Sequence, residues 1–185
     1  MLIDQKHYTI VRNDVPVLTK QADGSYNDTY NYLIDVNLKS DAIKQIIKPF
    51  GFGNNINDIL EHLSRFSRQR FATFVFLALT TPKITTPDFN VVDDVLSICL
   101  YQTESATSYA WVHYFETNPK YRHGCANNAK YKHVGTSACH VFQEKYINRG
   151  IAARVPRMSV QDFLLKNGFK HMDEHESFLC WNLQR

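Results

Sequence analysis

The order of the apolar segments in the second half of the chain restricts the fold more than any other feature. Segments with the length and the β-branched or aromatic content of strands lie at 71–79, 91–101, 109–117, 151–155, 169–172 and 178–183. Helical spacing is found from Val134 to about Asn148, and again from the N-cap residue Ser159 to Gly168. This order predicts an α/β (α+β) fold, in which helices pack on a mixed sheet.

The first seventy residues carry weaker signals. Asp23 and Gly24 form a turn signal between two strand-like segments, so a hairpin is expected over 11–31. The sequence leaves the register of this hairpin open. Two amphipathic helices are expected after it, at 40–48 and at 56–66. This N-terminal portion is the least recognisable part of the chain.

Composition and charge limit the classes of partner. The 185 residues are 44% hydrophobic and 21% charged, and the formal net charge of +3 is too small to indicate a nucleic-acid partner by itself. The chain starts without the basic end and apolar stretch of a signal peptide, and no apolar run approaches the length of a membrane helix. We therefore expect one cytoplasmic domain over residues 1–185, without a membrane partner.

The cysteines do not indicate a zinc site, because no two of them have the C-x-x-C spacing of zinc fingers. In a cytoplasmic protein they are expected to be reduced thiols. Cys99, Cys139 and Cys180 lie in apolar segments, whereas Cys125 lies in a polar loop and is expected to be the most reactive. No metal is expected.

The start of the helix at Val134 is the most informative stretch for function. Lys132 and His133 bring positive charge to it, and the small residues Gly135, Ser137 and Ala138 let a ligand approach its backbone. The first turn of a helix presents unpaired N–H groups and the positive end of the helix dipole. The sequence therefore predicts a phosphate or pyrophosphate site at this position.

Three segments resemble motifs of the GNAT family of acyl-CoA-dependent N-acyltransferases. Segment 117–119 (TNP) resembles the V-x-P end of a strand, and 132–137 (KHVGTS) resembles the helix start R/Q-x-x-G-x-G/A, with lysine and serine as replacements. Segment 163–169 (FLLKNGF) is similar to F-Y-x-K-x-G-F. The resemblance covers 111–183, where the order of the expected elements also agrees.

The resemblance implies a mostly antiparallel sheet that splays open between its fourth and fifth strands, here 109–117 and 151–155. Acetyl-CoA, or another acyl-CoA, would enter this gap, with its pyrophosphate on backbone N–H groups at 134–138. Backbone groups at 115–117 would bind the pantetheine and polarise the thioester carbonyl, as an oxyanion hole does. The residues implied to bind the cofactor are Phe115, Thr117, Lys132, His133, Val134, Gly135, Thr136, Ser137 and Ala138.

The implied reaction is direct attack of an amine on the thioester, which requires a base to take a proton from the ammonium group. Glu116 is the first candidate for this base, and His113 is the second. The spacing between them along one strand is odd, so we expect them to face opposite sides of the sheet and only one to face the substrate. The family's tyrosine acid falls on Leu164, which cannot donate a proton.

Two other functions stay open at this point. One is a binding protein that keeps the fold without catalysis, which Leu164 favours. The other is a nucleic-acid-binding module that uses the basic and aromatic residues of 120–132, although the nearly balanced charge disfavours it. The acceptor is an amine-bearing small molecule or a peptide, and the sequence is compatible with a homodimer. The aromatic residues Trp111, Tyr114 and Phe115 are interpreted as sheet packing.

Overall fold

The computed structural model describes residues 8–37, 72–79, 94–105, 108–118, 121, 131–154, 158–172 and 175–183. Its strands are β1 (Tyr8–Lys20), β2 (Tyr26–Asn37), β3 (Ala72–Leu79), β4 (Val95–Thr103), β5 (Ala110–Thr117), β6 (Tyr131–Lys132), β7 (Ile151–Arg154), β8 (Lys170–Met172) and β9 (His175–Trp181). Its helices are α4 (Val134–Lys145) and α5 (Met158–Lys166). The helices expected at 40–48 and 56–66, and the polar loop with Cys125, lie outside the described residues.

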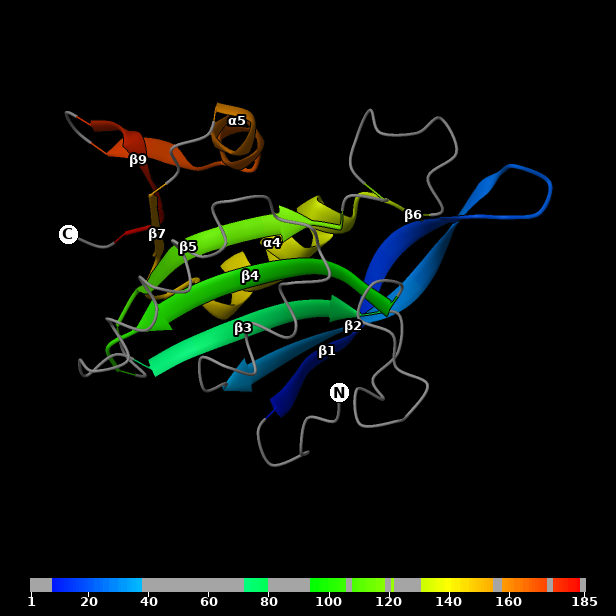
Figure 1. The fold of residues 1–185 in the computed structure, drawn as a ribbon, viewed down its shortest axis with the longest axis horizontal. Helices are drawn as coiled ribbons and strands as arrows, with labels where there is room; N and C mark the ends of the chain where they lie inside the picture. The colour runs from blue at the N-terminus through cyan, green and yellow to red at the C-terminus, as the bar shows by residue number, and fades with distance from the viewer. Residues whose placement is uncertain are drawn as a thin grey trace.

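One mixed sheet runs through the described residues, with the strand order β6-β1-β2-β3-β4-β5-β7-β9-β8. The β5–β7 pair is parallel, and the other recorded pairs are antiparallel. Figure 1 shows α4 behind the central strands and α5 beside β9. The prediction of a mixed sheet with helices packed on it is therefore confirmed.

The hairpin expected near the N-terminus is formed by β1 and β2, which pair from Tyr8 with Val36 to Lys20 with Tyr26. At its tip, Gly24 has a φ of 87°, a conformation that glycine adopts without steric cost. The Asp23 carboxylate accepts hydrogen bonds from the N–H and the hydroxyl of Ser25, at 2.9 and 2.6 Å, which lowers the pKa of Asp23. The turn signal in the sequence thus predicts the correct place of the turn.

Strand β4 is the centre of the core, since its residues from Val95 to Gln102 are all buried. Tyr101 is 1% exposed and packs edge-on against Phe142 and Tyr146, with ring centroids 4.9 and 5.7 Å apart. These contacts place α4 on the face of the sheet to which Tyr101 points. The run of apolar residues in β4 is the pattern expected for a strand that is buried on both faces.

The boundaries of several elements differ slightly from the predictions. Helix α5 begins at Met158, so Ser159 lies in its first turn and is not its N-cap. Strand β6 was not predicted; it has two residues and pairs with β1, Leu18 opposite Lys132 and Thr19 opposite Tyr131. Neither α4 nor α5 is long and apolar enough to cross a membrane.

The buried thiol of Cys139 gives the stability of the fold an expected pH dependence. Burial raises the pKa of Cys139 from 9.0 to about 12. The thiol therefore ionises in the unfolded chain from about pH 9 but stays neutral in the folded protein, and the free energy of unfolding falls as pH rises between these values.

Between about pH 8 and about pH 10, this effect is expected to lower the free energy of unfolding by about 1 kcal/mol more in the wild type than in Cys139→Ala. Urea unfolding of both proteins at the two pH values measures the difference, and the variant cancels the contributions of all other titrating groups. Equal losses in the two proteins would contradict the burial of this thiol.

Candidate active site

Strands β5 and β7 run in parallel and separate after a short pairing. The pairing joins Ala110 to Ile151, Trp111 to Ala152 and Val112 to Ala153, whereas β5 continues to Thr117. Figure 1 shows the two strands starting side by side and diverging, β5 toward the start of α4 and β7 toward α5. Ligands commonly bind beyond the carboxyl ends of parallel strands where successive connections diverge. Beyond the pair Val112 and Ala153, β7 is therefore no longer the strand partner of β5.

A β-bulge lies at the point where the two strands separate. In the register of β4 with β5, Leu100 pairs with Tyr114 and Tyr101 pairs with Val112, so His113 is an extra residue on β5. Bulges redirect side chains and are frequent next to active sites. The bulge therefore changes which side chains of β5 share a face.

The expectation that His113 and Glu116 face opposite sides of the sheet is wrong, because the bulge interrupts the alternation of side chains. His113 Nε2 lies 2.7 Å from the Oε1 of Gln102, and Gln102 is the strand partner of Trp111. The imidazole also lies 6.5 Å from the Trp111 ring, centroid to centroid. His113 and Trp111 thus share one face.

Glu116 lies on that face as well. Its strand partner is Ile98, which shares a face of β4 with Gln102 because the two are an even number of residues apart. Tyr114 donates a hydrogen bond from its hydroxyl to Glu116 Oε2 at 2.8 Å. Both side chains are half-buried. Tyr114 was not predicted as a site residue, although its spacing of two from Glu116 was a signal for it.

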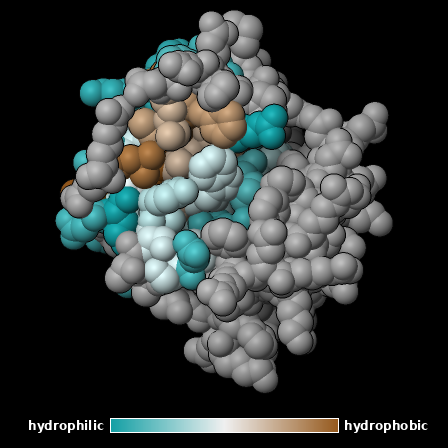
Figure 2. All heavy atoms as spheres, turned by 90° about the vertical axis from the view of Figure 1, so that its left-hand side faces the viewer, coloured by the Kyte–Doolittle hydropathy of each residue, from teal (hydrophilic) through white to brown (hydrophobic). Residues whose placement is uncertain are grey.

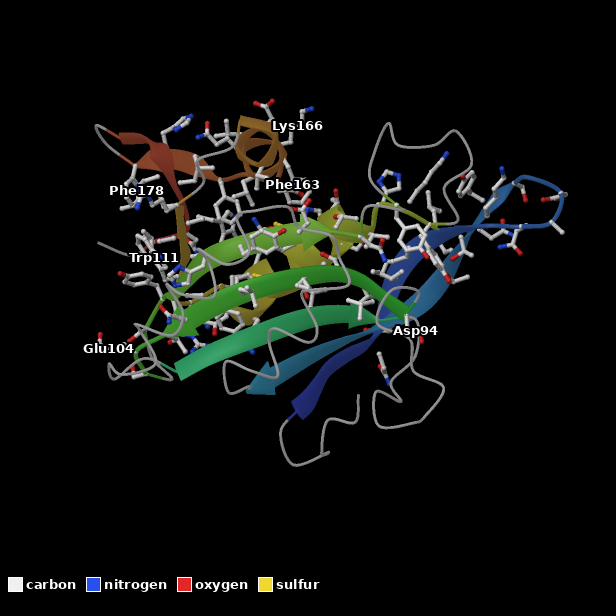
Figure 3. All side chains as sticks on the ribbon, viewed as in Figure 1. Asp94, Glu104, Trp111, Phe163, Lys166 and Phe178 are labelled. Atoms are coloured by element: carbon white, nitrogen blue, oxygen red, sulfur yellow. The ribbon has the colours of Figure 1, made fainter. Side chains whose placement is uncertain are left out.

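On the opposite face, three of the predicted cofactor residues meet beside α4. Gly135 lies so close to β5 that a Cβ atom added to it would be 2.6 Å from Thr117 Oγ1. The same atom would lie 3.4 Å from the ring of Phe163, and this ring stacks on Phe115 at 5.5 Å. Figure 3 labels Phe163 on α5. The aromatic pair thus connects β5 to α5 across the divergence.

The contact of Gly135 with Thr117 predicts a stability effect. Gly135→Ala is expected to lower the free energy of unfolding by about 1–3 kcal/mol, because the added methyl group overpacks the contact. Thr117→Ala combined with Gly135→Ala removes the hydroxyl and is expected to recover part of that loss. Urea unfolding of the wild type, both single variants and the double variant measures the coupling. Strictly additive losses would contradict the contact.

The first turn of α4 offers a ligand fewer N–H groups than the predicted site at 134–138 would provide. Ser137 N–H donates to the carbonyl of His133 at 2.9 Å, so the intrahelical bonds start there. Ala138 follows inside the helix and is 2% exposed. The N–H groups without an intrahelical acceptor are therefore those of Val134, Gly135 and Thr136. His133 precedes them in the left-handed conformation, with a φ of 61°, and its side chain makes no capping hydrogen bond to the helix.

The β1–β2 hairpin lies against this helix start. The Ser137 hydroxyl donates to the carbonyl of Pro16 at 2.9 Å, which holds the side chain toward β1. The Lys132 ammonium lies 3.8 Å from the centroid of the Tyr26 ring. Lys132 and His133 are both exposed. Positive charge is thus held next to the first turn of α4, where an anion would bind.

The structure also shows where the position of the missing tyrosine acid and the aromatic residues of 120–132 lie. Leu164 is 2% exposed and belongs to the core. Because it is a leucine, α5 has no hydroxyl at this position that could act as a general acid. Tyr131 is 8% exposed and packs edge-on against Tyr121. Its ring is therefore not open to solvent, where a base could stack on it. Among the described residues, no group of three or more His, Cys, Asp and Glu side chains is arranged to hold a metal ion.

Comparisons with protein-family models, with curated proteins and with solved structures found no match to this chain.

Proposed function

We propose that this protein is an acyl-CoA-dependent N-acyltransferase, which transfers an acetyl or other acyl group to an amine. The observation that carries the proposal is that the parallel strands β5 and β7 separate at the bulge, since their last pair joins Val112, the residue before His113, to Ala153. A backbone edge that leaves its parallel neighbour can pair with an extended ligand chain, as an added strand would. The amide-containing pantetheine arm of CoA has the donors and acceptors for this pairing.

The two ends of the diverging region suit the two ends of the cofactor. At the far end of β5, the N–H groups of Val134, Gly135 and Thr136, the charge of Lys132 and the imidazole of His133 are suited to the pyrophosphate. At the near end, the bulge interrupts the regular backbone of β5, and backbone N–H groups there would polarise the thioester carbonyl. Acyl-CoA would thus lie along β5, from the start of α4 toward the bulge at His113.

In this arrangement, the acceptor amine reaches the thioester from the face of Glu116. Once the ammonium group has lost one proton to the base, the amine nitrogen forms a bond to the carbonyl carbon, the carbon–sulfur bond breaks, and CoA leaves as a thiolate that takes up the second proton lost by the nitrogen. Glu116 accepts the proton of the ammonium group, and the hydroxyl of Tyr114 orients its carboxylate. His113 is the second candidate for the base, with its ring oriented by Gln102.

A binding protein without catalysis is the second candidate, and the buried Leu164 is the observation that favours it. The experiment that separates the two incubates the protein with acetyl-CoA and a panel of amines, and detects acetylated amines by mass spectrometry. An acylated amine that requires the protein supports the transferase. Saturable binding of acetyl-CoA without any product would contradict the transferase and favour the binding protein.

A further inference from the structure

A cluster of rings lies on the face of β5 that carries Glu116, and we call Tyr109, Trp111, His113 and Phe178 the aromatic patch. Trp111 is at its centre, with ring centroids 6.4 Å from Tyr109, 6.5 Å from His113 and 6.0 Å from Phe178. Figure 3 shows Trp111 and Phe178 near one another beside β7. The patch therefore joins two strands, β5 and β9, that lie on either side of β7.

The aromatic patch is accessible to solvent. Tyr109 is 46% exposed, and Trp111 and Phe178 are half-buried. Figure 2 looks onto this side of the molecule, where apolar and near-neutral residues form one area bordered by hydrophilic ones. Sheet packing alone accounts for fully buried rings, as the sequence suggested for Trp111, but neighbouring rings that are partly exposed are typical of surfaces that bind a ligand.

The position of the aromatic patch relates it to the proposed reaction. Trp111 comes two residues before His113, the extra residue of the bulge, and His113 belongs to both features. Phe178 pairs with Arg154, the last residue of β7. The patch thus borders the point where β5 and β7 separate, on the face from which the amine would approach.

The charge beside the aromatic patch limits what can bind there. The Arg154 guanidinium is exposed and lies 5.8 Å from the centroid of the Phe178 ring. A cation in this position disfavours a polyamine or a lysine-rich peptide more than an amine with a single charge, because each further positive charge adds repulsion. A flat apolar group is complementary to the patch, since offset or edge-on ring contacts contribute beyond the area that they bury.

We infer that the aromatic patch binds an amine that carries an aromatic ring, an arylalkylamine, and that this is the acceptor class of the proposed acyltransferase. The inference rests on the proposed function for the role of the amine as acceptor. The ring of the acceptor stacks on Trp111, and its amine points toward the bulge. Transfer from acetyl-CoA yields the N-acetyl arylalkylamine and CoA thiol, and it releases one proton from the ammonium group.

The test titrates phenylethylamine and, separately, spermidine into the full chain by calorimetry. Phenylethylamine is expected to bind and spermidine is not. Trp111→Ala is expected to weaken phenylethylamine binding about tenfold, which corresponds to the loss of roughly one ring contact. Trp111→Phe keeps a ring and is expected to retain most of the affinity. Ile147→Ala is the matched control, since Ile147 is an exposed apolar residue at the end of α4, with 54% exposure.

Each outcome decides the inference. Spermidine binding without phenylethylamine binding would overturn it, and so would equal phenylethylamine binding by the wild type and Trp111→Ala. A wild-type dimer in sedimentation that becomes a monomer in Trp111→Ala, with no amine binding, would show that a second copy covers the patch and would also overturn it. Titration of acetyl-CoA tests the proposed function separately. If acetyl-CoA fails to bind while phenylethylamine binds through Trp111, the transferase is overturned and the amine site is supported.

Discussion

Glu116→Gln is expected to lower kcat by about 10²–10⁴-fold, because an amide cannot accept the proton of the ammonium group. The amide keeps the shape of the side chain, and its oxygen can still accept the hydrogen bond from Tyr114. The affinity for acetyl-CoA is expected to stay the same, since Glu116 lies on the face of β5 opposite the contacts with α4. Steady-state kinetics with the best acceptor of the amine panel measures kcat, and calorimetry measures the affinity.

Glu144→Gln is the matched control, because Glu144 is an exposed glutamate on α4, away from the face of Glu116. The control is expected to keep the wild-type kcat. A wild-type kcat in Glu116→Gln would contradict the role of Glu116 as the base. In that case a loss of activity in His113→Gln would assign the base to His113, which shares the same face.

Gly150→Ala is expected to cause the largest loss of stability, more than about 3 kcal/mol in the free energy of unfolding. Gly150 has a φ of 79°, and a Cβ atom there would lie 2.6 Å from the carbonyl oxygen of Asn182 and 2.8 Å from the Cα of Leu183. Both obstacles are backbone atoms, so no side-chain rotation relieves them. The carbonyl of Gly150 also accepts the N–H of Ala110 at 3.2 Å, at the paired end of β5 and β7.

Gly24→Ala separates strain from overpacking, because Gly24 has a similar φ of 87° but nothing within 4 Å of an added Cβ. Gly24→Ala is expected to lower the free energy of unfolding by only about 1–2 kcal/mol, because alanine is strained in the left-handed conformation. Urea unfolding of both variants measures the difference. A loss in Gly150→Ala no larger than that in Gly24→Ala would contradict the close approach of Asn182 to Gly150.

The order of elements in the second half could be predicted because it depends on local patterns. The apolar run of β4 and the helical spacing from Val134 are set by neighbouring residues. The turn at Asp23 and Gly24 is equally local. The short strand β6 could not be predicted, since its pairing partner in β1 is remote in the sequence and the pairing is tertiary.

In the candidate site as well, local features could be predicted and features that depend on tertiary pairing could not. Gly135 and Thr117 belong to local motifs, and the structure brings them into contact. The shared face of His113 and Glu116 was missed, because a bulge depends on the register with β4 and a count along one strand does not include it. The bond from Ser137 to Pro16 joins remote segments, so the sequence did not indicate that this hydroxyl faces β1.

The central claim is that acyl-CoA binds along β5 with its phosphates at the start of α4, and calorimetric titration of acetyl-CoA tests it most directly. Lys132→Glu reverses an exposed charge at this position without adding a side chain at the tightly packed Gly135. Lys170→Glu makes the same change on an exposed lysine of β8 and serves as the control. We predict saturable binding by the wild type, affinity lowered about tenfold or more in Lys132→Glu, and no change in Lys170→Glu. No binding by the wild type, or equal weakening in both variants, would contradict the proposed site.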